Sequence, residues 1–480
     1  MRMTPVLLAA ALAVGASVRA QPLPELGDAS AVAMTPQMER RLGEEVMREI
    51  RYGDPAYVED PEITDYLQRL GNQLVAQVPG LRQDFQFFAM RDPTVNAFAL
   101  PGGFIGVNTG LISLTDDESE LASVLGHEIG HVEQHHIARM VSNQEQMQVP
   151  SMLALAAALL LAGSRPDLAA GAFAAIQGGA IQHQLSYTRD FEREADRVGF
   201  QTLRAANFDV NAMPQFFEKL QRATRLSDDG SAPSFLRTHP LTPERIADME
   251  GRAAGVPYHQ HRDSLDYYLV RAKLRAESGD AQDAVEAIAG SVRDRRYVNE
   301  AAARYALVSA RLRAGQVKQA QADLVALRAT GAASPMIDSL AARVQLAAGD
   351  KAGALATLSE ALKRYPGRLP LVYAYALALH EEGRNADVLA LIDAPMRQFP
   401  YEAGLRELQA QAYAGLGKRL LQHQAQAEVY VLRGSVPAAI EQLQLARAAG
   451  DGNFYELSSV EARLKELRAQ HAQAQRDAKH

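Results

Sequence analysis

The chain has 480 residues, of which 47% are hydrophobic and 22% charged, and its formal net charge is −7. This composition is that of a folded globular protein, so it excludes a collagen-like or wholly disordered chain, and the length favours two or more domains. The acidic balance gives no sign of a nucleic-acid partner. The absence of cysteine excludes a disulfide framework, a thiolate zinc site and a cysteine nucleophile. Any metal site must therefore use histidine and carboxylate ligands.

The N-terminus has the layout of a secretory signal peptide. Arg2 precedes an apolar run from Val6 to Val14, and the small residue Ala20 stands before Gln21. A basic start, an apolar centre and a small residue at the cleavage site are typical of exported proteins. A short buried helix is the alternative interpretation. We expect residues 1–20 to be a signal peptide that is removed on export.

The next segments predict helices followed by a small sheet. After an irregular lead, Thr35 and Pro36 start a helix with apolar residues four positions apart, and a second helix is expected from Ile63 to Val78. Residues 85–114 are rich in aromatic and β-branched residues around the Gly102-Gly103 turn, so we expect short strands here. Thr115 with Glu118 three residues later predicts a capping box at the start of the next helix.

Two Ala- and Leu-rich segments follow, Met152–Gly163 and Leu168–Ile181. Each is shorter than the ~20 residues that a bilayer-spanning helix needs, and Arg165 and Asp167 lie between them. We therefore predict no transmembrane span and expect buried helices. Contact with a membrane or a partner protein is the alternative.

The C-terminal half repeats with a regular period. Glycines recur 34 to 36 residues apart at positions 279, 315, 349, 383 and 417, close to the 34-residue period of tetratricopeptide repeats. Alanines seven positions before most of these glycines allow two helices of a hairpin to approach closely. We expect an α-solenoid over residues 263–480, closed by a capping helix through Leu464 and Leu467. A generic Ala-rich helical bundle is the alternative.

The chemistry-bearing motif is His127-Glu128-x-x-His131. Two histidines four residues apart lie on one helical face, so both imidazoles can reach one tetrahedral ion, with Glu128 beside the open position. The alternative is a pair of core or surface histidines. Apolar neighbours indicate an inner helix, however, where two unpaired imidazoles and a carboxylate would be costly.

A third ligand has to come from elsewhere. The position six residues after His131, where a metzincin has histidine, is Ile137. Glu192 and Asp196 are four residues apart and share a helical face, so one carboxylate can bind the metal while the other orients a ligand histidine. On spacing alone, an ordinary surface array of charges with the neighbouring arginines fits equally well.

His-Glu-x-x-His followed by Glu-x-x-x-Asp, with Asn96–Gly103 upstream, resembles the M48 metallopeptidases, the family of the CAAX prenyl proteases. The resemblance covers about residues 34–262. It implies that Glu192 is the third zinc ligand and that Asp196 orients a ligand histidine. It also implies that His239 approaches the zinc from a loop and can hold the enzyme latent. This chain differs from the integral membrane members of the family, because it is expected to be exported and carries repeats. In this it is similar to periplasmic members that serve outer-membrane β-barrel assembly.

We therefore expect an α+β protein: a mostly helical zincin-type catalytic domain with a small β-sheet over 34–262, then tetratricopeptide-like repeats over 263–480. It should bind one Zn²⁺ per chain and use Glu128 as general base. The strand around Asn96 to Leu100 should be an edge that pairs with an extended substrate. The expected function is periplasmic cleavage of misfolded or stalled proteins, with the repeats contacting the outer-membrane assembly machinery. A chaperone or binding module with a largely latent zinc site is the rival, whereas a purely structural zinc is disfavoured by the open fourth position.

Overall fold

The computed structural model describes residues 34–81, 83–142, 189–226 and 233–477. Two expectations therefore lie outside the described residues: the signal peptide at 1–20 and the Ala-rich segments at 152–181. Within the described ranges, the search for a helix of sufficient length and apolarity to traverse a lipid bilayer found none.

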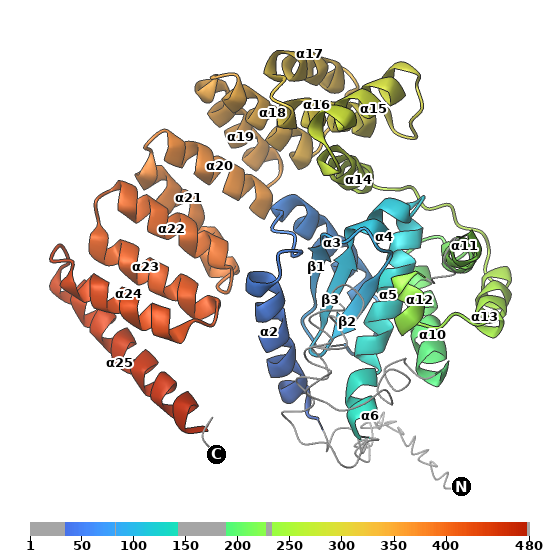
Figure 1. Cartoon of the computed structure of the whole chain (residues 1–480), viewed down its shortest axis with the longest axis horizontal. Helices are drawn as coiled ribbons and strands as arrows, with labels where there is room; N and C mark the ends of the chain where they lie inside the picture. Colours follow the sequence, from blue (N-terminus) through green and yellow to red (C-terminus); the bar gives the residue numbers. More distant parts are fainter. Residues whose placement is uncertain (1–33, 82, 143–188, 227–232, 478–480) are drawn as a thin grey trace, which may run out of the picture.

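The N-terminal part is a three-stranded sheet surrounded by helices (Figure 1). The strand order is β1-β3-β2, with β1 parallel and β2 antiparallel to β3. The small sheet is thus confirmed, but the strand pattern ends earlier than expected, because Thr109–Leu114 forms a helix. The elements are α2 (Pro36–Gly53), α3 (Pro61–Val75), β1 (Gln86–Met90), β2 (Ala97–Leu100), β3 (Phe104–Asn108), α4 (Thr109–Leu114), α5 (Glu118–Glu133), α6 (His136–Ser142), α10 (Arg189–Ala205), α11 (Ala212–Leu226), α12 (Ser234–Thr238) and α13 (Pro243–Ala254).

The start of α5 corrects one prediction. Its N-cap is Asp117, whose side chain accepts a hydrogen bond from the backbone N–H of Glu120, and not Thr115. Thr115 is instead the C-cap of α4, and its hydroxyl lies 3.0 Å from the Tyr267 hydroxyl. The predicted start of α2 is confirmed: the helix begins at Pro36, and the Thr35 side chain accepts a hydrogen bond from the N–H of Met38.

Helix α5 is the central helix of this part and is buried from Glu118 to Val132. Glycines allow α10 to approach it closely. A Cβ atom added at Gly130 would lie 2.9 Å from the carbonyl oxygen of Ala195, and one added at Gly199 would lie 2.8 Å from the backbone nitrogen of His127. This close approach places the acidic residues of α10 beside the histidines of α5.

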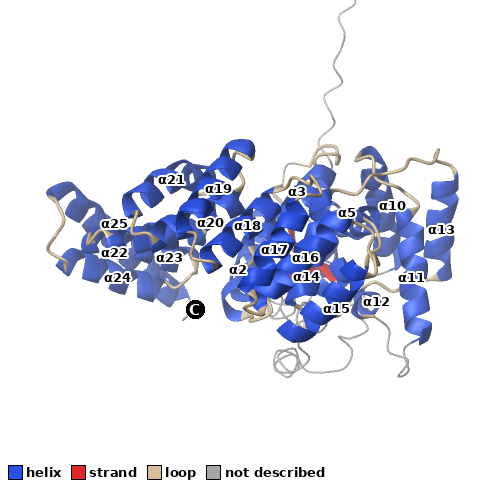
Figure 2. Cartoon of the chain, turned by 90° about the horizontal axis from the view of Figure 1, so that it is seen from above, coloured by secondary structure: helices blue, strands red, loops and turns tan. Residues whose placement is uncertain are grey.

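The C-terminal part is an array of stacked helices (Figures 1 and 2). The five regularly spaced glycines, at positions 279, 315, 349, 383 and 417, all have positive φ, between 63° and 82°, and each lies between two helices. The helices are α14 (Leu265–Glu277), α15 (Ala281–Arg293), α16 (Glu300–Arg313), α17 (Val317–Arg328), α18 (Pro335–Ala347), α19 (Lys351–Arg364), α20 (Leu369–Glu381), α21 (Asn385–Gln398), α22 (Ala403–Gly415), α23 (Arg419–Leu432), α24 (Val436–Ala448) and α25 (Phe454–Asp477). Leu464 and Leu467 of α25 pack on the preceding helices, as a capping helix should.

The helix array does not stand apart from the sheet-containing part. One hydrophobic core runs from Val58 through the sheet and α5 into the first repeats, as far as Val344. The array then curves round beside α2 and α3 (Figure 1). There Arg368 pairs with Asp65 at 2.7 Å. The predicted fold class, a mostly helical part with a small sheet followed by stacked helices, is confirmed.

Candidate metal centre

Two histidines of α5 and one glutamate of α10 converge at a buried point. The Nε2 atoms of His127 and His131 lie 3.0 Å apart. Glu192 reaches both, with Oε2 at 3.4 Å from the His127 Nε2 atom and Oε1 at 3.5 Å from that of His131. All three side chains are at most 2% exposed. The structure therefore brings together residues that are 65 positions apart in the sequence.

His239 adds a fourth nitrogen to this cluster. It is the C-cap of the short helix α12, and its ring stacks on Phe235 at a centroid distance of 4.5 Å. Its Nδ1 atom lies 3.3 Å from His127 Nε2 and 3.0 Å from Glu192 Oε1. His239 is buried, so the loop that follows α12 holds an imidazole where a fourth ligand could lie.

The spacing of these atoms fits a tetrahedral Zn²⁺ site. Two ligand atoms about 2.05 Å from one zinc ion at the tetrahedral angle are about 3.3 Å apart. The nitrogen and oxygen atoms of His127, His131, Glu192 and His239 are separated by 3.0 to 3.5 Å in the pairs described above. In addition, the two imidazole nitrogens that lie 3.0 Å apart are close enough to ligate one ion. The residues present thus fit the ion.

The outer nitrogens of both α5 histidines are oriented by further side chains. Asp196 Oδ1 lies 2.9 Å from His127 Nδ1. Burial opposes a charge on His127, but Asp196 and Glu192 raise its pKa to about 10. His131 Nδ1 lies 2.8 Å from His136 Nδ1. A partner at the outer nitrogen fixes the tautomer that presents the other nitrogen to a metal.

His136 and its neighbour have different surroundings. His136 is fully buried, and its Nε2 atom lies 3.1 Å from Glu194 Oε2. His135 is exposed and contacts Glu39 at 3.1 Å. His136 also contacts His131 of the cluster, through the Nδ1 atoms of both rings. Glu194 points away from the cluster, as expected from its position on α10, and supports His136.

Arg245 of α13 is the main site residue that the sequence analysis missed. Its guanidinium pairs with Asp196 through two nitrogens, at 2.7 and 2.8 Å, and with Glu192 Oε2 at 2.8 Å. Arg245 is 2% exposed. A signal existed, since Arg245 occupies the first place of a buried stripe on α13 that continues with Met249 and Ala253. A charged residue on an otherwise buried face is costly unless it is paired.

Glu128 lies beside the cluster without joining the set of converging atoms. It is fully buried, and neither carboxylate oxygen forms a well-shaped hydrogen bond within the described part of the chain. Burial raises its pKa, against the opposing charges of His239 and His127. The backbone N–H of Ala99 also lowers that pKa to some extent, which places β2 beside Glu128. A buried carboxylate with a raised pKa and unsatisfied oxygens is suited to accept a proton.

Within the described residues β2 is an edge strand of the sheet, bordered at its start by α12, where the backbone N–H of Phe235 donates to the carbonyl oxygen of Val95 at 3.0 Å. It is the last strand of the sheet, paired on one side with β3. Asn108 donates its N–H to the carbonyl oxygen of Asn96, so Asn96 is at a hydrogen-bonded position of the ladder. Because hydrogen-bonding residues alternate along an antiparallel strand, the N–H groups of Ala97 and Ala99 point away from β3.

Comparison with known proteins identifies the family. The model of peptidase family M48 matches residues 61–253. The β-barrel assembly-enhancing protease of Yersinia pestis is 30% identical over 452 residues, which cover 93% of this chain and 91% of that protein. The chain belongs to peptidase family M48.

Two further relatives have the same description. The β-barrel assembly-enhancing protease of Escherichia coli K12 is 30% identical over 94% of this chain and 92% of its own length. A putative protease of the same name from Vibrio cholerae is 41% identical over 254 residues, which span 53% of this chain and about half, 52%, of that relative. The M48 family implies zinc, so the chain is a metalloendopeptidase with a buried histidine and carboxylate cluster that could hold the metal.

Proposed function

We propose that one Zn²⁺ per chain is held by His127, His131 and Glu192, with Glu128 as general base. The observation that supports this most directly is the cluster of converging atoms, all within 4.8 Å of one another, with Glu128 next to it. In this proposal Asp196 orients His127. Purified protein should contain about one zinc per chain by elemental analysis and should digest casein until a chelator removes the metal. Zinc-free protein with full activity would contradict the proposal.

The residues divide the chemistry among them. Zn²⁺, when bound, polarises the scissile carbonyl and lowers the pKa of a water molecule towards ~7. Glu128 accepts the proton of the attacking water and donates it to the leaving amine, a role suited to its buried, unsatisfied carboxylate. Arg245 neutralises Asp196 and one oxygen of Glu192, so two carboxylates can be buried beside the metal.

His239 keeps this site latent in our proposal. Its Nδ1 atom is among the converging atoms, and its Nε2 atom lies 3.5 Å from Glu128 Oε1, so it fills the space where a substrate carbonyl and the water must lie. A contact of this kind to a charged partner is worth about 1.5 kcal/mol or more, hence about tenfold. His239→Ala should therefore raise casein turnover about tenfold at unchanged zinc content.

The control for this experiment is His259→Ala, because His259 is an exposed residue in the loop after α13. It should leave casein turnover unchanged. A loss of turnover in His239→Ala would show that His239 assists the reaction, which would overturn latency.

The edge of β2 is proposed to align the substrate. The N–H of Ala99 faces Glu128, so an extended peptide would pair with the outward N–H of Ala97 and be held through its main chain, with little choice of sequence. Ala97→Pro removes this donor while the ladder to β3 stays intact. We expect kcat/KM for a quenched peptide to fall at least about tenfold, the effect of one lost hydrogen bond of about 1.4 kcal/mol.

Ala97→Gly is the matched control, because it keeps the N–H and removes the buried methyl group. Its kcat/KM should stay near that of the wild type, and melting curves should show that both variants are folded. Equal cleavage by Ala97→Pro and the wild type would exclude pairing along this edge.

The cellular role is also a proposal. The relatives are called β-barrel assembly-enhancing proteases, and the N-terminal sequence predicts export. We propose a periplasmic endopeptidase, with residues 1–20 as signal peptide and 34–262 as catalytic domain, that degrades misfolded or stalled outer-membrane proteins. The repeats at 263–480 would contact their assembly machinery.

The latent geometry around His239 favours one rival, a chaperone or binding module that seldom uses its zinc. The two hypotheses can be distinguished by complementation of a strain that lacks the protein. Full complementation by Glu128→Gln would favour the rival, whereas failure to complement would support proteolysis.

A further inference from the structure

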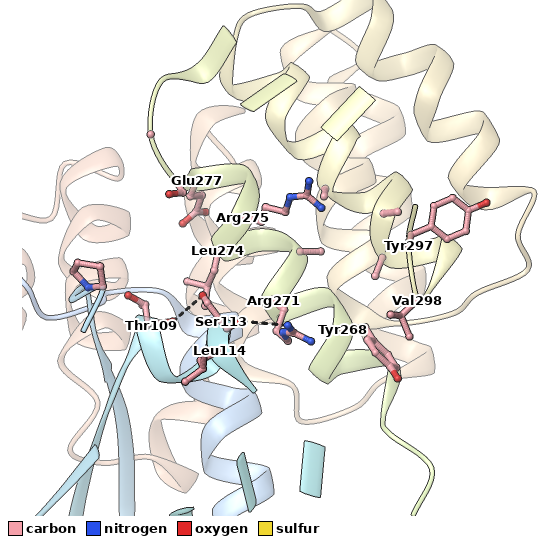
Figure 3. Close-up of a pocket in the computed structure, with 18 of the residues that line it drawn as sticks. Thr109, Ser113, Leu114, Tyr268, Arg271, Leu274, Arg275, Glu277, Tyr297 and Val298 are labelled. Atoms are coloured by element: carbon pink, nitrogen blue, oxygen red, sulfur yellow. Dashed lines mark hydrogen bonds between the residues drawn. The ribbon is translucent and has the colours of Figure 1, made fainter. Parts of the chain in front are cut away.

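A cavity of about 920 Å³ lies outside the metal centre, between the sheet-containing part and the first repeats (Figure 3). Its walls are α4, α14, the start of α16 and the chain that leads from β1 to β2. Nothing in the chemistry described above uses this space. Its lining indicates what it could hold.

The lining carries an excess of positive charge in a chain whose net charge is negative. Four arginines contribute to it, and Arg91, Arg271 and Arg275 form no ion pair with a carboxylate of the described residues. Arg296 pairs with Asp294 at 3.0 Å. The lining contains a single carboxylate, Glu277, among the described residues.

Neutral contacts hold two of these arginines in place. The Arg271 guanidinium donates to the carbonyl oxygen of Ser113 at 3.2 Å, and that of Arg275 donates to the Ser291 hydroxyl at 3.0 Å. Figure 3 shows both side chains reaching from α14 into the same space. Each guanidinium has five N–H donors, so most of them stay available for a carboxylate.

The rim of the cavity is apolar and is suited to a polypeptide. Tyr297 and Val298 lie on the loop before α16, and the Val298 side chain is 87% exposed. Tyr268 of α14 faces the same opening in Figure 3. An exposed apolar rim beside unpaired arginines fits a peptide segment that carries both apolar side chains and a carboxylate.

The cavity lies beside one end of the proposed substrate edge. Pro93 and Val95 line it, and β2 begins at Ala97, two residues or about 7 Å further along the chain. Antiparallel pairing is the commoner arrangement of neighbouring strands. A substrate antiparallel to β2 enters from the Leu100 end and leaves past Ala97. The part of the substrate on the C-terminal side of the cleaved bond would then run towards the arginines.

We propose that this cavity binds a carboxylate of the substrate, from an acidic side chain or the chain terminus, on the C-terminal side of the scissile bond. The inference rests on the proposed function only in its use of the β2 edge. It adds a preference for substrates with negative charge at that end, where main-chain pairing alone would impose none.

The test measures binding without cleavage. Full-length Glu128→Gln protein is titrated into three fluorescent peptides that share one apolar core. The first has acidic residues near a free C-terminus, and the second has Asn or Gln in place of these acidic residues. The third keeps the acidic residues and has an amidated C-terminus. Fluorescence anisotropy should show the first bound at least about tenfold more tightly than the second or the third, the effect expected of a charge-assisted contact. The weaker of the two altered peptides tells which carboxylate is bound.

Arg91→Ala with Arg275→Ala, two exposed positions, should remove this preference in the Glu128→Gln background. The matched control is Arg447→Ala, an exposed arginine of α24, which should retain it. Equal affinity for all three peptides, or a preference that survives the double variant, would overturn the inference. Casein cleavage by the wild type is measured separately. Loss of the binding preference would therefore overturn this inference and leave the proposed peptidase function standing. Lack of zinc-dependent cleavage with an intact preference would overturn the peptidase function and leave the inference standing.

Discussion

Glu128→Gln should abolish peptide hydrolysis while the protein keeps its zinc. The substitution preserves the size of the side chain and removes its ability to accept a proton, a role worth about 10²- to 10⁴-fold in rate. The metal should stay because Glu128 is not among the converging atoms of His127, His131 and Glu192. Casein digestion and elemental analysis on the same preparation measure both results.

The control for this variant is Glu133→Gln, at the last residue of the same helix and outside the cluster. It should digest casein at the wild-type rate. Residual activity of Glu128→Gln within tenfold of the wild type would rule out Glu128 as the general base, and loss of zinc would show that it binds the metal.

Arg245→Ala should destabilise the fold by about 3–5 kcal/mol, the usual cost of leaving a buried charge without its partner. Asp196 and Glu192 would lose their shared counter-charge, and both are 1% exposed. Because Zn²⁺ also neutralises Glu192, the loss should be larger with chelator present than with zinc. Chemical denaturation under both conditions gives the free energy of unfolding.

Arg252→Ala on the same helix is the matched control. Arg252 pairs with Asp248 at 2.9 Å on the exposed face of α13, where an ion pair is worth about 0–1 kcal/mol. If the free energy of unfolding of Arg245→Ala lay within about 1 kcal/mol of that of this control, the buried guanidinium would not be what stabilises the two carboxylates.

Local patterns predicted what local geometry determines. The spacing of His127 and His131 is enough to place two imidazoles on one side of a helix, and the glycines of the repeats lie in turns because their positive φ suits residues without a side chain. The cap of α5 was misplaced for a local reason as well. Thr115 with Glu118 and Asp117 with Glu120 satisfy the same pattern, and the sequence cannot choose between them.

Contacts between distant helices were harder to foresee. Arg245 pairs with Asp196 only because α13 packs on α10, and His136 meets His131 only because the chain turns between α5 and α6. Spacing alone left Glu192 undecided between a ligand and a surface charge. The glycine contacts between α5 and α10 then bring it within 3.5 Å of both histidines.

The core that the sheet shares with the first repeats has a mechanical consequence. Tyr267 of α14 donates a hydrogen bond to the carbonyl oxygen of Thr115 just before α5, and Lys273 of α14 pairs with Glu62 at the start of α3. The helix array is therefore fixed to the sheet-containing part through α14 and is not joined to it by a flexible linker alone. If the repeats bind a substrate as proposed, they hold it in a fixed orientation relative to α5, so the distance and direction from the repeats to α5 decide which of its segments can be cut.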